Sequence, residues 1–205
     1  MDIEKNLNSI SKKLSNYDAK LIPVIKNRTI EEVKEVYDYG FREFGENRLK
    51  DYFLHSEKFK DAIYHFIAPL QSRKIKSIFE KFEFIHTVSR YKEIDVISKL
   101  ENKRETFLQV NIDNDHNKSG IDPYLIFEYF EYSKDRINLP IGLMCIPNIE
   151  SDPKLVFSRM QNINSELKNI YSEYKGELSM GMSKDYEIAL DYGATIVRVG
   201  SKIFK

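Results

Sequence analysis

The chain has 205 residues, 41% of them hydrophobic and 31% charged, which is the size and composition of one soluble globular domain. Thirty-two Lys and Arg residues balance thirty-two Asp and Glu residues, so no overall field attracts a polyanion, and nucleic acid is not expected as a partner. No apolar run reaches the length of a membrane span, and the single cysteine, Cys145, excludes an internal disulfide.

Helical and extended patterns alternate along the chain. The opening residues, Met1 to Asn6, lack the basic start and apolar stretch of a secretory signal, so a cytoplasmic location is expected. Helical spacing of apolar residues then predicts a helix over 2–18. Eight apolar runs are predicted strands, at 21–25, 41–44, 64–67, 84–88, 107–112, 141–146, 178–180 and 195–199. Helices are predicted between them, at 30–39, 47–60, 72–81, 91–100, 123–133, 153–174 and 184–192.

Polar residues and glycines mark the ends of two of these helices. Thr29 and Ser183 each stand just before a predicted helix and are predicted N-caps. Gly40 and Gly193 stand where two helices should stop. Cys145 lies in an apolar run, which predicts a buried, inert thiol and not a nucleophile.

Eight apolar strands alternating with helices favour a closed, TIM-type (β/α)₈ barrel over a doubly wound open sheet. No linker divides the chain, so residues 1–205 are predicted to form one domain. Only residues 200–205 follow the last strand, which leaves no room for a regular eighth helix. The opening helix is therefore expected to take that place in the outer ring. In such barrels, functional residues gather on the loops that follow the strands.

Lys26 closes the first predicted strand and would face this mouth. An amine that is desolvated there can lose its proton and react with a carbonyl group. The alternative is an ordinary lysine at a strand end that only interacts with solvent.

Small residues follow the last two strands. Gly181 and Ser183 precede a helix, and Gly200 and Ser201 close the last strand, so backbone N–H groups and hydroxyls are free to hold a phosphate. Ordinary turn glycines and a helix cap are the alternative.

Nine segments, spread over most of the chain, together match one pattern: Val24-Ile25-Lys26, Phe44-Gly45-Glu46-Asn47, His65 to Ser72, His86-Thr87-Val88, Gln109 to Ile112, Asn117 to Gly120, Gly142-Leu143-Met144, Leu178 to Ser183 and Val197 to Ser201. In these segments the chain resembles the pyridoxal phosphate homeostasis proteins, which are single-domain relatives of the alanine racemase N-terminal barrel. Arg28, Ala68 and Arg73 depart from the family's usual residues, which leaves open whether a second cofactor site exists near the mouth.

The resemblance implies pyridoxal 5′-phosphate (PLP) as cofactor, bound as a Schiff base on Lys26. It also implies that Arg198 reaches the pyridine nitrogen, which stays unprotonated because arginine only donates hydrogen bonds. The phosphate would contact Ser179, Ser183, Gly200 and Ser201, and the groups lining the ring would be Asn47, His65 and Met180. For His65, a histidine satisfied within the barrel is an equal alternative.

The implied function is intracellular PLP homeostasis, meaning storage, protection and delivery of the cofactor without a dedicated reaction. The resemblance suggests a monomer whose recipients would be apo-enzymes that need PLP. The rival function is a low-activity PLP-dependent racemase, which would need a second proton donor opposite Lys26. A metal-dependent hydrolase ranks last, because His55, His65, His86 and His116 do not form a ligand set.

Overall fold

A computed structural model describes residues 2–115 and 118–205, so His116 and Asn117, named above, lie outside the described residues. The strands are β1 Lys20–Pro23, β2 Glu43–Glu46, β3 Ile63–Phe66, β4 Phe84–Val88, β5 Glu105–Gln109, β6 Gly142–Met144, β7 Glu177–Ser179 and β8 Ile196–Val199. The α-helices are α1 Ile3–Leu14, α2 Ile30–Asp38, α3 Leu49–Ser56, α4 Ile75–Lys81, α5 Tyr91–Ile97, α6 Ile126–Lys134, α7 Pro153–Ile170 and α8 Tyr186–Asp191. Short 3₁₀ turns precede α4 and α6, at Ser72–Lys74 and Pro123–Leu125.

All the strands pair in parallel, and from β2 to β8 each pairs with the next strand in the sequence. The last strand returns to the first, with β1 and β8 in register from Lys20 opposite Ile196 to Pro23 opposite Val199. Between β1 and β2 the ring closes through one isolated bridge, Val24 to Gly45, and the Ile25 N–H donates to the Gly45 carbonyl at 3.0 Å. The predicted (β/α)₈ barrel is therefore confirmed, with a thin seam between β1 and β2.

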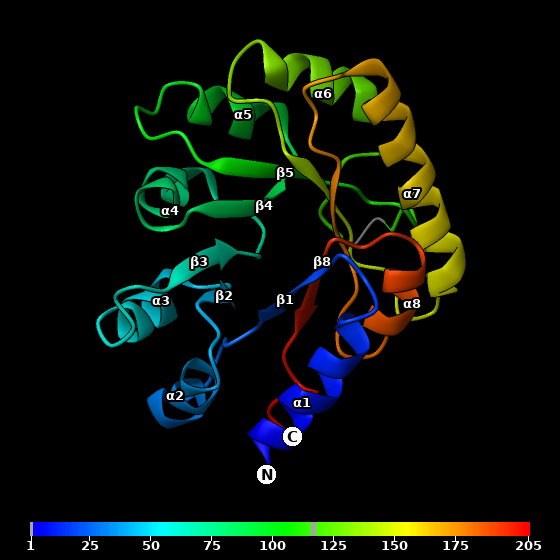
Figure 1. Ribbon diagram of the computed structural model, residues 1–205. Helices are drawn as coiled ribbons and strands as arrows, with labels where there is room; N and C mark the ends of the chain where they lie inside the picture. Colours follow the sequence, from blue (N-terminus) through cyan, green and yellow to red (C-terminus); the bar gives the residue numbers. More distant parts are fainter. Residues whose placement is uncertain (1, 116–117) are drawn as a thin grey trace.

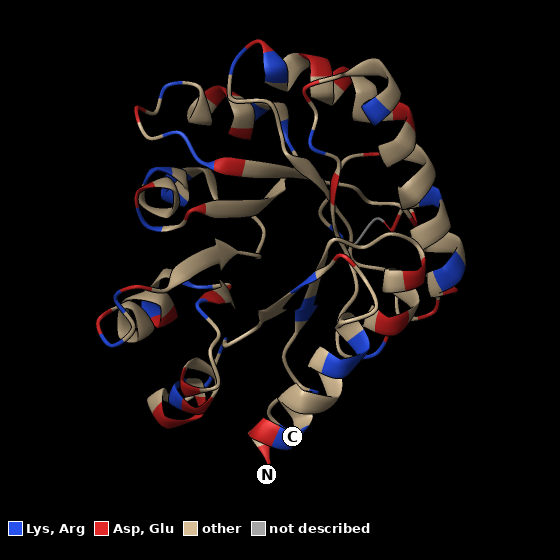
Figure 2. Ribbon diagram, viewed as in Figure 1, with Lys and Arg blue, Asp and Glu red and all other residues tan. Residues whose placement is uncertain are grey.

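The helices surround the strands, and α1 lies beside the C-terminus (Figure 1). Its contacts place it between α8 and α2: Lys13 pairs with Glu187 of α8 at 3.4 Å, and the Tyr39 hydroxyl at the end of α2 donates to Asn8 at 2.7 Å. The opening helix thus takes the eighth place in the outer ring, as predicted. Basic and acidic segments are interspersed along the outer helices in the view of Figure 2, in line with the net charge of zero.

Two hydrophobic clusters form the core. The larger joins the outer faces of the strands to the helices and includes Phe44, Phe130, Phe157 and Cys145. The smaller fills part of the barrel interior with Ile22, Phe107, Ile141, Met144 and Ile196. Burial raises the pKa of the Cys145 thiol to about 12, which confirms the prediction of an inert thiol. Among the described residues, no helix has both the length and the apolar content to cross a bilayer.

One predicted helix cap is confirmed and the other is wrong. Thr29 caps α2 in a capping box, in which its hydroxyl accepts from the Glu32 N–H at 3.2 Å and the Glu32 carboxylate accepts from the Thr29 N–H at 2.9 Å. Ser183 is not a cap, because α8 begins at Tyr186 with Asp185 before it. Gly40 and Gly193 follow their helices with φ of +121° and +81°, as expected for residues that end a helix.

The second predicted strand is shifted along the chain. It runs over Glu43–Glu46 instead of 41–44. Two of these four residues are charged, and their histidine partners, His65 of β3 for Glu43 and His55 of α3 for Glu46, could not be seen in the apolar pattern. The strand predicted at 84–88 has the bounds of β4, and the other six predicted strands overlap the observed ones and differ at the ends.

Candidate cofactor site

Lys26 lies in the turn that follows β1, at the mouth formed by the carboxyl ends of the strands. Its side chain is exposed, and no hydrogen bond or ion pair joins its amine to a described residue. The expected position is confirmed and the expected burial is wrong. Exposure begins at Lys26, directly after the buried Ile25, and Asn27 follows in the left-handed region at φ +58°.

A buried acid–histidine pair holds this turn against the end of β2. His55 Nδ1 lies 2.8 Å from Glu46 Oε1, both side chains are buried, and the opposite ring nitrogen, Nε2, lies 3.2 Å from the Arg28 carbonyl oxygen. Because that carbonyl only accepts, Nε2 carries a proton, and a second proton is shared between Nδ1 and the carboxyl group. Burial raises the pKa of Glu46. Sequence analysis missed this pair, since a spacing of nine residues across a strand and a helix has no recognisable period.

Arg28 contributes a second attachment. Its guanidinium lies 4.7 Å from the centre of the Phe204 ring and pairs with Glu32 at 3.2 Å. The Lys26 turn is therefore fixed to the chain's C-terminal residues as well as to β2.

Asn47, directly after β2, has a buried side-chain oxygen with no hydrogen-bond partner among the described residues. Buried polar atoms normally have partners, so an unpaired acceptor at the mouth fits a ligand that carries a donor.

The turn after β8 presents backbone donors beside the end of β1. The Ser183 hydroxyl oxygen accepts from the N–H groups of Gly200 and Lys202 at 3.3 and 3.2 Å, and its own hydrogen remains free to donate. A Cβ on Gly200 would lie 3.2 Å from the Val24 carbonyl oxygen, two residues before Lys26. Ser201 follows and is exposed. Ser183, Gly200 and Ser201 are thus brought together close to the Lys26 turn.

Arg198, on β8, is a buried cation. Its Nη1 donates to Ser179 Oγ at 2.6 Å and its Nη2 to the Cys145 carbonyl at 2.9 Å. Among the described residues, no carboxylate lies within ion-pair distance, and burial lowers the pKa of Arg198 to about 10. Burying a charge without a counter-ion is costly, so this guanidinium fits an acceptor supplied by a ligand.

Three predicted cofactor residues lie elsewhere than expected. Ser179 points into the barrel, where its hydroxyl is engaged by Arg198 and by His86 Nδ1 at 2.8 Å, and not toward the Gly200 turn. His65 has both ring nitrogens engaged inside the barrel, which decides between its two interpretations in favour of a satisfied histidine. Met180 has no exposed surface and packs in the larger core cluster, because side chains alternate in direction along the strand end.

Metal ligation finds no support in the described part of the chain: no three His, Cys, Asp or Glu side chains there are grouped to hold an ion.

Known proteins match the chain over most of its length. No family model matches it. It is 35% identical over 196 residues to the pyridoxal phosphate homeostasis protein of Aquifex aeolicus, covering 91% of this chain and 86% of the relative. The chain belongs to the pyridoxal phosphate homeostasis protein family. The family's protein from Schizosaccharomyces pombe is 33% identical over 196 residues, covering 90% and 82% of the two chains.

Solved structures agree with this membership. PipY of Synechococcus elongatus superposes with a TM-score of 0.88 at 30% identity in a structure without PLP, covering 99% of this chain and 100% of PipY. A second PipY structure, with PLP bound, gives 0.86 at 28% identity. An alanine racemase of Clostridium difficile gives 0.78 at 14% identity over 56% of its chain, which shows a shared fold alone.

Proposed function

We propose that this family member binds PLP as a Schiff base on Lys26 and serves PLP homeostasis by storing, protecting and delivering the cofactor. The observation that carries the proposal is Arg198, a buried cation with no counter-ion among the described residues, two residues before the Gly200 turn that lies against the end of β1. A ligand with a ring acceptor, a phosphate and an aldehyde would meet Arg198, the turn and Lys26 in that order. The PLP-bound structure of PipY supports the same assignment.

Each group of the proposed site has one task. The Lys26 amine, in its neutral form, would be the group that holds the aldehyde of the cofactor covalently, with water as the other product. The Ser183 hydroxyl, the Ser201 hydroxyl and the Ser201 backbone N–H would donate to the phosphate, because the N–H groups of Gly200 and Lys202 already donate to Ser183. Asn47 accepts from a hydroxyl on the ring. Lys26 is exposed without ligand, so the ring itself would supply the apolar surroundings that favour the neutral amine.

PLP stabilises negative charge at a carbon next to its bound nitrogen, and a protonated ring nitrogen strengthens this ability. Arg198 donates to that nitrogen and keeps it unprotonated, which weakens catalysis. Racemisation also needs a proton donor on each face of the substrate carbon. Tyrosine hydroxyls are common donors, but those of Tyr37, Tyr91, Tyr132 and Tyr171 bond to carboxylates of outer helices and loops. These points favour a binding protein over a racemase. As part of the proposal, the protein is a monomer and hands PLP to apo-enzymes.

Borohydride reduction tests the proposal. The purified protein, incubated with PLP and reduced, should gain the mass of one reduced pyridoxyl phosphate group on Lys26, as mapped by peptide mass spectrometry. Lys26→Arg keeps the charge and should abolish the label, whereas Lys184→Ala, an exposed lysine that also lies near the mouth, should retain it. A label on another lysine, or none in the unaltered protein, would overturn the assignment.

The racemase alternative makes a separate prediction. Exchange of the α-proton of amino acids in D₂O, at rates well above those of free PLP and abolished by Lys26→Ala, would establish catalysis and displace the homeostasis proposal.

A further inference from the structure

A continuous chain of hydrogen bonds crosses the barrel interior from Arg198 to Glu43, which lies at the face of the barrel where the strands begin. Arg198 Nη1 contacts Ser179 Oγ at 2.6 Å, and Ser179 Oγ contacts His86 Nδ1 at 2.8 Å. His86 Nε2 contacts His65 Nδ1 at 2.9 Å, and His65 Nε2 contacts Glu43 Oε2 at 3.1 Å. Five strands contribute one residue each to this hydrogen-bond chain, which begins beside the proposed cofactor site and ends at the opposite face of the barrel.

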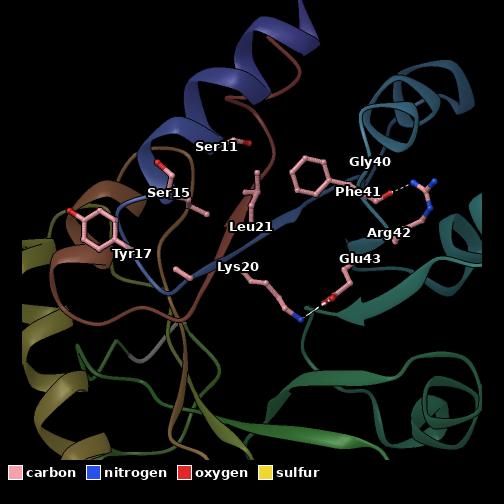
Figure 3. Close-up of a pocket in the computed structure, with 11 residues that line it drawn as sticks. Ser11, Ser15, Tyr17, Lys20, Leu21, Gly40, Phe41, Arg42 and Glu43 are labelled. Carbon is pink, nitrogen blue, oxygen red and sulfur yellow. Dashed lines mark hydrogen bonds and ion pairs between the residues drawn. The ribbon is translucent and has the colours of Figure 1, made fainter.

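The base end of the chain opens onto a pocket. Glu43 and Lys20 line a hollow of about 580 Å³ below the strands, and the Lys20 amine lies 2.8 Å from Glu43 Oε1 (Figure 3). The hydrogen bond from His65 and the adjacent Lys20 lower the pKa of Glu43 to about 2. Glu43 is therefore an ionised carboxylate, which can only accept hydrogen bonds.

Arg198 and Glu43, the two end groups of this hydrogen-bond chain, fix the donor and the acceptor of every bond between them. Arg198 can only donate and Glu43 can only accept. Burial lowers the pKa of both His65 and His86, so both rings are neutral, and each has one donor and one acceptor nitrogen. Only one arrangement satisfies all five groups: each histidine carries its proton on Nε2, and the Ser179 hydroxyl donates to His86 Nδ1.

Aromatic contacts hold both rings in place. His65 stacks on Phe84 with ring centres 4.4 Å apart, and His86 on Phe107 at 4.3 Å. The rings therefore have little freedom to rotate away from their partners, and the chain is rigid.

We propose that Ser179 and His86 are positioning residues that orient Arg198 toward the bound ring, and that His65 and Glu43 select the tautomer of His86 that this requires. The proposal rests on the proposed function only for the identity of the ligand that Arg198 faces. A carboxylate placed directly on Arg198 would neutralise it and compete with the ligand. Through four hydrogen bonds, Glu43 instead polarises the chain and stabilises the cation while the remaining N–H groups stay available.

Two near-isosteric substitutions of His86 isolate the hydrogen bond. Both His86→Asn and His86→Leu remove the ring and its stacking on Phe107, but only Asn keeps an oxygen that can accept from Ser179. Ser179→Ala removes the link itself. Thr106→Val, at a buried β5 position whose hydroxyl has no partner, is a control that changes a strand without touching the chain.

The first measurement needs no PLP. Long-range ¹H–¹⁵N spectra of the histidine rings should show His65 and His86 as neutral Nε2–H tautomers that do not titrate between pH 6 and 8. The Arg198 side-chain N–H signals should exchange slowly in the unaltered protein, Thr106→Val and His86→Asn, and at least several-fold faster in His86→Leu and Ser179→Ala. The opposite tautomers, or equal exchange in all five proteins, would overturn the proposal.

The second measurement uses added PLP. His86→Leu and Ser179→Ala should shift the absorption maximum of bound PLP and weaken its binding about tenfold, while His86→Asn stays close to the unaltered protein. In an Arg198→Gln background, His86→Leu should cause no further shift, because it acts through Arg198. A full effect in that background would contradict the positioning role. If the unaltered protein takes up no PLP, the proposed function fails, and the NMR result alone decides whether the chain orients Arg198.

Discussion

Arg198 is a charged side chain that the folded barrel buries at an energetic cost. Its only described partners are a hydroxyl and a carbonyl, so the folded protein carries the cost of a desolvated charge that a bound acceptor would reduce. Ser179, expected to contact the phosphate, serves this cation instead.

Reversing the charge at this position tests the ring contact. In Arg198→Glu the carboxyl group would favour a protonated ring nitrogen, so the absorption spectrum of bound PLP should change and the affinity should fall. Spectrophotometric titration with PLP measures both. The same spectrum and affinity as in the unaltered protein would mean that Arg198 lies away from the ring.

The neutral histidines make stability depend on pH. Because burial lowers the pKa of His86 and His65 below their unfolded value near 6.5, the unfolded chain binds more protons between about pH 6.5 and 5. The free energy of unfolding should therefore fall as the pH falls through that window. In His86→Asn the slope should decrease by about 1.4 kcal/mol per pH unit, the value for one proton. Urea unfolding at pH 5, 6 and 7 measures it, and parallel slopes would show that His86 is charged when folded.

Single residues also mark the limit of what the sequence can predict. The position of Lys26 followed from its place after an apolar run, but its exposure did not, since a left-handed Asn27 leaves no pattern. The partners of His65 and His86 are on other strands. Pairings between residues so distant in the sequence depend on the strand register, which periodicity does not give.

Among the elements, α2 bears most directly on the site, because it begins three residues beyond the Lys26 turn. Its capping box satisfies two backbone N–H groups that the helix start would otherwise leave unpaired.

Removal of that cap should weaken the helix and the turn before it. Thr29→Ala is expected to lower the free energy of unfolding by about 1 kcal/mol, and Thr29→Ser should keep most of it, because serine caps as well as threonine. Urea unfolding of the three proteins checks the expectation. Equal losses in both variants would mean that the methyl group of Thr29, and not its hydroxyl, matters.

Element types were predictable where apolar residues repeat at a clear interval. The seven later helices and the opening one were found, and the clearest of them, such as α1 and α7, cover the barrel with a buried apolar stripe. The position of β2 was not predicted, since two of its four residues are glutamates whose partners are histidines of other elements, His55 and His65. Ser183 was assigned to a helix start because serine is common there, whereas its hydroxyl joins two loops across the mouth.

For the whole molecule, the barrel followed from eight apolar runs alternating with helices, but the uneven closure of the ring did not. β1 pairs with β8 over four residues and meets β2 through one bridge. Lys26 continues the chain from one side of this seam, and Asn47 follows the strand on its other side.

Amide hydrogen exchange can measure the strength of the seam. The Ile25 N–H, which donates to Gly45 across it, should exchange faster than the Val24 N–H, which donates to Val199 of β8. With PLP bound, exchange at Ile25 should slow markedly while Val24 changes little. Equal slowing at both amides would indicate general stabilisation, and not a local effect on the seam.

A ligand that contacts both Lys26 and Asn47 would link the two sides of the β1–β2 seam, where the backbone provides a single bridge. Part of the binding free energy would then stabilise the closed barrel, so ligand release and opening of the seam would be coupled. If the protein delivers PLP as proposed, a recipient enzyme that displaces the Lys26 turn would start the transfer of the ligand.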